Sequence, residues 1–119
     1  MLPEIITEIP GPNSRSLSKK LRQNESRNIN YVTNDFPIFW DRAKGTNVWD
    51  VDNNRFLDLT SAFAVSSFGH SCPELDSAFT QQSEHLMHGM GDVHPTMQKV
   101  QLCKKLSSLT FERWTGKKA

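Results

Sequence analysis

A narrow hydrophobic stripe marks the first polar stretch of the chain, because Leu17 and Leu21 stand four residues apart among charged and amide side chains. This spacing places both leucines on one face of a helix. Ser14 precedes them and belongs to a residue type that caps helix starts. We therefore expect a surface helix that begins after Ser14 and ends near Asn28. Residues 1–13 contain three prolines and a glycine and are expected to form an extended arm.

Alternating hydrophobic and polar residues predict a β-hairpin in the next stretch. Val48, Asp50 and Asp52 alternate with Trp49 and Val51, and Arg55, Phe56, Leu57, Asp58 and Leu59 follow. The dipeptide Asn53-Asn54 suits a two-residue turn, since asparagine tolerates a positive φ. We expect the hairpin to bury Trp49 and Val51 on one face. Phe56 or Leu57 would lie opposite, and the alternating aspartates would keep the outer face in contact with water.

Two more helices are predicted after a small apolar segment, residues 62–68. Pro73 suits the first position of a helix, with Ser71 or Cys72 as its cap. Helical spacing is kept by Leu75, Ala78, Phe79, Gln82 and Leu86, is interrupted at Gly89 and Gly91, and resumes with Val100, Leu102, Leu106 and Leu109. Pro95 is expected to open the last helix. The tail after it shows no clear period.

The composition is low in hydrophobic residues, which make up 36% of the 119 residues against a usual apolar share of ~45–50%. One small domain is the upper bound for this length, and we expect its core to be loose or dependent on a partner. Fourteen basic and thirteen acidic residues give a net charge of +1. The clustered positive charge of a nucleic-acid-binding protein is therefore lacking.

The sequence favours a soluble chain in a reducing compartment. No stretch approaches the ~20 apolar residues of a membrane span. The first residues, MLPEIITEIPGP, lack the basic start and apolar core of a signal peptide, so a cytoplasmic location is expected. Cys72 and Cys103 are then expected to be reduced thiols.

The histidines and serines suggest a metal site and a nucleophile–base pair, but neither pattern is complete. The histidines nearest one another are His85, His88 and His94. Their spacing matches no recognised zinc pattern, and zinc requires a third and usually a fourth ligand, so we expect no metal site. Ser66 or Ser67 with His70 would make a nucleophile and base, but no G-x-S-x-G motif surrounds them.

Two segments carry a more specific signal, namely NVWDVDNNRFLDLTSAFAVSSFGHSCP at 47–73 and HLMHGMGDVHP at 85–95. The first resembles the motifs G-x-x-V-W-D-x-D-G-x-R-Y-L-D and G-H-x-H-P of class-III aminotransferases. The matching residues are Gly45, Val48, Trp49, Asp50, Asp52, Arg55, Phe56, Leu57 and Asp58, then Gly69, His70, Ser71, Cys72 and Pro73. Asn53 replaces the turn glycine, and Cys72 replaces the second histidine. The resemblance covers about residues 11–111 and is closest to the 4-aminobutyrate-aminotransferase-like members.

This resemblance implies a transaminase that depends on pyridoxal 5'-phosphate and moves an amino group from an amine or amino acid to an oxo acid. It implies the α/β fold of type I pyridoxal-phosphate-dependent transferases for the parent, and a homodimer. The piece in hand is expected to be α+β, with an arm, a short β-hairpin and about three helices. Phe63, Ala64, Gly91 and Asp92 match stretches that line the substrate side of the family's pocket. Plain core packing is the alternative for Phe63.

The same resemblance implies that the catalytic groups lie outside these residues. In the family, the Schiff-base lysine, the aspartate for the pyridine nitrogen and the phosphate-binding turn all follow downstream. We therefore expect this chain to contain no catalytic or coenzyme-binding residue, to lack the major coenzyme-binding domain and to be inactive alone. The alternative is a non-catalytic interaction module, or a truncated gene product, that docks through its amphipathic helices.

Overall fold

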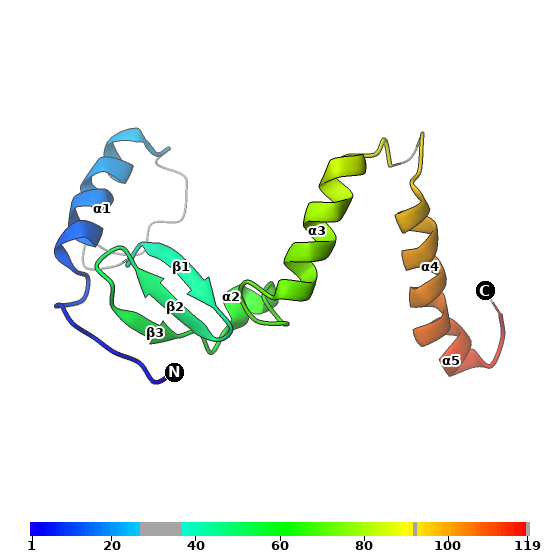
Figure 1. Cartoon of the computed structure of the whole chain (residues 1–119), viewed down its shortest axis with the longest axis horizontal. Coiled ribbons are helices and arrows are strands. Elements are labelled where there is room, and N and C mark those ends of the chain that lie inside the picture. The colour runs from blue at the N-terminus through cyan, green and yellow to red at the C-terminus, as the bar shows by residue number, and fades with distance from the viewer. Residues whose placement is uncertain (27–36, 92, 119) are drawn as a thin grey trace. The chain divides into compact units, whose positions relative to one another are not determined.

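A three-stranded antiparallel sheet forms the centre of the first part of the molecule (Figure 1). The computed structural model describes residues 1–26, 37–91 and 93–118 and divides into two units, Met1–Ser77 and Ala78–Ala119. The strands β1 (Trp40–Lys44), β2 (Asn47–Asp50) and β3 (Arg55–Leu57) lie in the order β1-β2-β3. The hairpin of β2 and β3 confirms the α+β expectation. The edge strand β1 was not predicted.

The turn between β2 and β3 is longer than the predicted two residues. The backbone N–H of Asn53 donates to the carbonyl of Asp50 (3.0 Å), and the N–H of Asp50 donates to the carbonyl of Asn54 (3.0 Å). Four residues, 51–54, therefore lie between the strands, and the pairing of Asp50 with Asn54 closes the turn. Asn53 has a φ of 63°, the left-handed conformation that asparagine tolerates better than most residues. The exchange of the motif's glycine for Asn53 is thus compatible with this turn.

The buried face of β2 is the opposite of the predicted one. Val48 is 1% exposed and Asp50 is fully buried, whereas Trp49 is only half-buried. The carboxylate of Asp50 accepts hydrogen bonds from the backbone N–H of Asp52 (2.9 Å), the backbone N–H of Asn54 (2.8 Å) and the Asn54 side chain (2.9 Å). The aspartates do not keep an outer face wet. Asp50 is buried among backbone donors of the turn that it satisfies.

Asp52 caps the helix α1 (Pro12–Asn24), although the two are far apart in sequence. Its carboxylate accepts from the backbone N–H groups of Asn13 (2.7 Å) and Ser14 (2.9 Å), two of the donors that a helix start leaves unpaired. Burial opposes ionisation of Asp52, but these hydrogen bonds outweigh it and hold its pKa below 3.8. The prediction of Ser14 as the cap is therefore wrong. The helix ends at Asn24, with Glu25 after it in an extended conformation, so it stops short of the predicted end near Asn28, a residue outside the described ranges.

The amino-terminal arm lies along the free edge of β3. Glu4 and Arg55 exchange backbone hydrogen bonds of 2.9 and 2.8 Å. The side-chain oxygen of the buried Asn54 accepts from the backbone N–H groups of Ile6 (2.8 Å) and Thr7 (2.9 Å). The arm thus covers an edge that would otherwise present unpaired backbone groups.

The predicted downstream helices are present with shifted boundaries. The helix α3 (Pro73–His85) begins at the expected proline, and the Cys72 carbonyl accepts from the N–H of Asp76 (3.0 Å). The helix α4 (Met97–Leu109) begins two residues after Pro95, because Thr96 is its cap and accepts from the N–H of Lys99 (3.3 Å). A short helix α5 (Phe111–Thr115) occupies the tail for which no period was seen.

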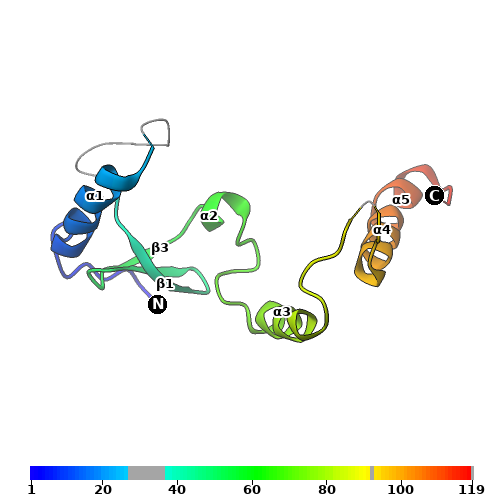
Figure 2. The ribbon, with the colours of Figure 1, turned by 90° about the horizontal axis from the view of Figure 1, so that it is seen from above.

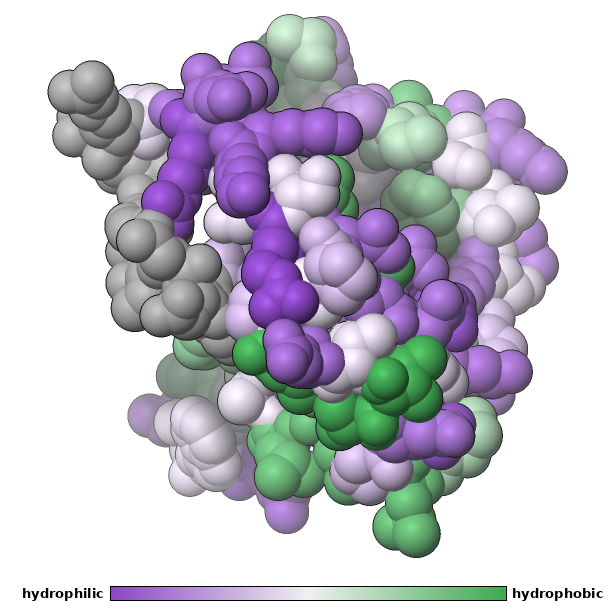
Figure 3. All heavy atoms as spheres, turned by 90° about the vertical axis from the view of Figure 1, so that its left-hand side faces the viewer, coloured by the Kyte–Doolittle hydropathy of each residue, from purple (hydrophilic) through white to green (hydrophobic). Residues whose placement is uncertain are grey.

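Apolar side chains are largely exposed in both units. Among the described residues, Val48 is the one buried hydrophobic side chain. Apolar and polar side chains reach the surface side by side on the face shown in Figure 3. In the second unit, the α4 residues Val100, Leu102, Leu106 and Leu109 are 59%, 59%, 51% and 49% exposed. The described part of the chain therefore holds a polar hydrogen-bonded centre and little hydrophobic core.

None of the helices in the described ranges is both long enough and apolar enough to span a membrane.

Candidate functional site

The segment after β3 contains a left-handed turn, α2 (Ser61–Ala64), which follows the sheet in Figures 1 and 2. Its four residues have φ values of 52°, 49°, 57° and 65°. None is glycine, and each L-residue in this conformation costs roughly 1–2 kcal/mol. Such a turn persists only where surrounding contacts impose it.

Asp58 is the main acceptor that holds this turn. One carboxylate oxygen, Oδ1, accepts from the backbone N–H (3.0 Å) and the hydroxyl (2.8 Å) of Thr60. The other, Oδ2, accepts from the backbone N–H of Ala62 (2.8 Å) and lies 2.8 Å from Nε2 of His70. The Asp58 side chain is 4% exposed and that of His70 is 13% exposed. The pair is therefore shielded from water, while the turn that it contacts is not.

His70 is in turn attached to the sheet. It exchanges two backbone hydrogen bonds of 2.8 Å with Gly45, at the turn between β1 and β2. Its ring lies edge-on to Trp40, with centroids 5.8 Å apart. Gly69 precedes it with a φ of 84°, and a Cβ there would lie 3.3 Å from the Gly45 carbonyl oxygen. The positive φ favours glycine here, and a Cβ would also crowd that oxygen.

The pKa of the Asp58 carboxyl is lowered from 3.8 to about 2, chiefly by the hydrogen bond from His70. Burial raises this pKa, but the further hydrogen bonds from Thr60 and Ala62 lower it. Asp58 is thus ionised at neutral pH and can only accept hydrogen bonds. It follows that Nε2 of His70 carries the donated proton.

The stabilisation contributed by Asp58 should depend on acid pH. Its pKa is lower in the folded chain than in the unfolded chain, so its contribution is full above about pH 4 and is lost as the pH falls towards 2. We expect the Asp58→Asn variant to lose less stability than the parent over this interval. Urea unfolding at pH 6, 4 and 3 measures this, and equal losses in the two proteins would contradict the assignment.

The predicted substrate-side residues fall into two groups. Phe63 and Ala64 lie on the left-handed turn, and Phe63 is 94% exposed. Core packing, the alternative for Phe63, is therefore not its role within this chain. Gly91 is exposed in the second unit, where its carbonyl accepts from Nζ of Lys99 (2.7 Å). Asp92 lies outside the described residues.

The other catalytic patterns are not assembled. His70 pairs with Asp58, and the Ser67 hydroxyl donates to the Ala64 carbonyl (2.8 Å). Within the ranges 1–26, 37–91 and 93–118, no three His, Cys, Asp or Glu side chains are grouped so that they could hold a metal ion. Cys72 and Cys103 are free cysteines.

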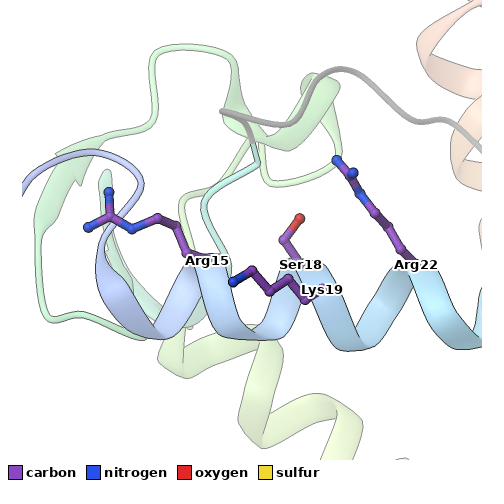
Figure 4. A pocket seen from close by; sticks show the side chains of 4 residues that line it. All are labelled: Arg15, Ser18, Lys19 and Arg22. Atoms are coloured by element: carbon purple, nitrogen blue, oxygen red, sulfur yellow. The ribbon is translucent and has the colours of Figure 1, made fainter.

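Two shallow surface hollows of about 270 Å³ each lie along helices. One is lined by Arg15, Ser18, Lys19 and Arg22 of α1 (Figure 4), and the other by Gln101, Lys104, Lys105, Ser108 and Glu112. Arg15 of the first hollow pairs with Glu8 at 3.3 Å. Each is formed by the outer surface of neighbouring helical residues, and neither contains a predicted substrate-side residue.

Sequence reasoning did not predict the Asp58–His70 pair. The sequence pattern places Asp58 among the carboxylates of the hairpin, and it offers His70 either as part of the motif before a helix or as a base beside Ser66 or Ser67. The available signal was that Asp58 ends the hairpin motif and His70 stands second in the next motif, 12 residues later. That separation is short enough for a single tight loop to return the histidine to the strand end.

Comparisons with known proteins identify relatives of the chain. The family model described as Aminotransferase class-III matches residues 29–116. A 4-aminobutyrate aminotransferase from Mycobacterium leprae is 34% identical over 107 residues, which are 90% of this chain and 23% of that enzyme. An acetylornithine aminotransferase from Methanothermobacter thermautotrophicus is 32% identical over 74 residues, 62% of this chain and 19% of that enzyme. The chain thus spans less than a quarter of the length of these relatives.

Solved structures share the fold. The match to acetylornithine aminotransferase from Elizabethkingia anophelis has a TM-score of 0.67 at 24% identity and covers 81% of this chain and 24% of that one. The match to taurine:2-oxoglutarate aminotransferase from Bifidobacterium kashiwanohense, solved in complex with PLP and glutamate, has a TM-score of 0.65 at 22% identity and covers 88% and 22%. The expected relationship to the type I fold of pyridoxal-phosphate-dependent transferases is confirmed.

Proposed function

We propose, from the premise that this chain belongs to the class-III aminotransferase family, that it forms the amino-terminal part of a transaminase dependent on pyridoxal 5'-phosphate. The reaction would move an amino group from an amine or amino acid to an oxo acid, and the active enzyme would be a homodimer. The strongest support is the match of residues 29–116 to the family model. The chain spans 23% of the length of its 4-aminobutyrate aminotransferase relative, which is consistent with one part of such an enzyme.

The residues present do not make a site that fits the coenzyme. A lysine that forms a Schiff base is activated by a dry pocket or a neighbouring cation. All eight lysines of the chain are exposed, and Nζ of Lys99 is bonded to a backbone carbonyl. We therefore propose that the coenzyme contacts are made by protein outside these residues, and that the chain alone is inactive.

Within this proposal the chain supplies part of the substrate side of the pocket. Phe63 and Ala64 of the left-handed turn would contact the substrate, and Gly91 and Asp92 would form a second lining stretch. The high exposure of Phe63 supports this, because a large apolar side chain at 94% exposure has no packing role in the described structure.

A chimeric enzyme tests the proposal directly. The chain would replace the matching segment of the Mycobacterium leprae 4-aminobutyrate aminotransferase, and a deletion of that segment would serve as control. We expect the chimera to bind pyridoxal phosphate and to transaminate an ω-amino substrate, and the deletion to do neither. A chimera that folds and binds the coenzyme but transfers no amino group would contradict the proposed function.

Phe63→Ala in this chimera should change substrate preference more than coenzyme affinity. Removing the ring leaves space for a bulkier amine, and such pocket changes shift specificity by about 10–200-fold. Comparing kcat/KM for an ω-amino substrate and a bulkier amine, with coenzyme affinity measured alongside, provides the test. An unchanged substrate ratio with weakened coenzyme binding would remove Phe63 from the substrate side.

A non-catalytic interaction module is the second candidate, supported by the exposed apolar residues of α4. This alternative predicts that the chimera stays inactive while the chain alone binds a partner protein.

A further inference from the structure

The left-handed turn Ser61–Ala64 has few contacts of its own that would impose its shape. Within the segment, the N–H of Ala64 donates to the Thr60 carbonyl (3.0 Å) and the N–H of Ser66 to the Ser61 carbonyl (2.9 Å). The carbonyls of Ala62 and Ala64 accept a long bond from the N–H of Val65 (3.4 Å) and one from the Ser67 hydroxyl (2.8 Å). These local hydrogen bonds are opposed by the conformational free-energy cost of four successive non-glycine residues at positive φ. The conformation must therefore be fixed by groups outside the turn.

Those outside groups are Asp58 and His70. The same Asp58 oxygen, Oδ2, accepts from the Ala62 backbone and faces Nε2 of His70, each at 2.8 Å. His70 is fixed to the sheet by its paired backbone hydrogen bonds with Gly45. A continuous series of hydrogen bonds therefore runs from the sheet, through the imidazole and the carboxylate, to the second residue of the turn.

The direction of Phe63 depends on this series. Its side chain is 94% exposed, so packing does not orient it. Its backbone, at a φ of 57°, decides where the side chain points. A return of the turn to the right-handed region would redirect the ring, because the Cβ direction follows the backbone dihedral angles.

We propose that Asp58 and His70 are positioning residues that fix the left-handed turn and thereby hold Phe63 where the substrate side chain is selected. This inference rests on the proposed function, since it presumes that Phe63 contacts substrate. The buried carboxylate and imidazole would thus influence specificity indirectly, through the position of Phe63, and neither would touch the substrate.

The test uses substrate selection in the chimera and a coupling between residues. We expect Asp58→Asn to change the ratio of kcat/KM for the ω-amino and bulkier substrates by about fivefold or more, since a misplacement of about 1 Å can change a rate by as much as about 100-fold. In a Phe63→Ala background, the same substitution should leave the ratio unchanged. Asp41→Asn, which alters an exposed aspartate paired with Arg42 at 3.1 Å, is the matched control and should have no effect.

Replacements of His70 keep the test decisive if Asp58→Asn does not fold. His70→Ala should shift the ratio in the same direction, and His70→Gln, which retains a side-chain N–H donor, should restore most of it. In the 119-residue chain, His70→Ala should also raise amide hydrogen exchange at Ala62 about tenfold or more over the parent.

The outcomes separate the two proposals. If Phe63→Ala leaves the substrate ratio unchanged, the proposed role of Phe63 fails. If Phe63→Ala changes the ratio but the Asp58 and His70 variants do not, the positioning inference is overturned. Equal effects of Asp58→Asn in the parent and Phe63→Ala backgrounds would also overturn it, because the carboxylate would then act independently of the ring.

Discussion

Asp50→Ala should detach the amino-terminal arm from the sheet. Asp50 is fully buried and accepts three hydrogen bonds, two of them from Asn54. Asn54 holds the arm through the N–H groups of Ile6 and Thr7. Loss of the carboxylate leaves buried donors unpaired, which lowers the free energy of opening by about 2–4 kcal/mol. Hydrogen exchange at Ile6 and Thr7 should accelerate by roughly 30- to 1000-fold.

A neighbouring aspartate provides the control for this prediction. Asp41 on β1 is exposed and pairs with the adjacent Arg42, so Asp41→Ala should leave exchange in the arm unchanged, since surface pairs of this kind contribute little. If hydrogen exchange at Ile6 and Thr7 stays slow in Asp50→Ala, the prediction is wrong, and the backbone pairing of Glu4 with Arg55 suffices to hold the arm.

The isolated chain should associate with itself at micromolar concentrations. Single exposed apolar residues are normal on protein surfaces, but contiguous ones mark interaction sites. In this chain, large apolar side chains from the arm to α5 are exposed, and Val48 alone is buried among the described hydrophobic residues. Association would remove this surface from water at about 25 cal/mol per Å² of apolar area. Sedimentation velocity across a concentration series should show a sedimentation coefficient that rises with concentration.

The helix α4 offers a matched pair of variants for that experiment. Leu102 and Leu109 are 59% and 49% exposed, so replacing both with glutamate should reduce association without creating a cavity. Gln101→Glu adds charge to a position that is already polar and should change little. A strict monomer with a sharp cooperative thermal transition would contradict the prediction.

Element types were predictable where a local signal decides them. Pro73 begins a helix because its fixed φ suits the first helical position, and no distant residue changes that preference. The cap of α1 was not predictable in this way, because its acceptor is Asp52, which is 38 residues from Ser14. The buried face of β2 was misassigned for a related reason. Alternation places Trp49 and Asp50 on opposite faces, and sequence hydrophobicity selects the tryptophan side.

Polar residues occupy the buried face of β2 because the arm and the turn that cover it supply hydrogen-bond donors. Asp50 and Asn54 are buried where the arm and the turn supply backbone donors, so their hydrogen bonds offset the loss of hydration. The left-handed turn was likewise not predictable from the sequence, since Ser61–Ala64 contains no glycine, the residue that usually indicates a positive φ. It exists because Asp58 and His70 impose it from either side.

The contact between Asp52 and the start of α1 sets an order of events during synthesis. Gly11 lies so close to the Asp52 side chain that a Cβ at this position would collide with it, and the backbone donors of Asn13 and Ser14 are both bonded to that carboxylate. A 13-residue helix is marginal in water without tertiary support. Its amino-terminal cap is made 38 residues later. We therefore expect the emerging chain to carry an unformed first helix until the hairpin has left the ribosome, and the arm and α1 to assemble onto the sheet together.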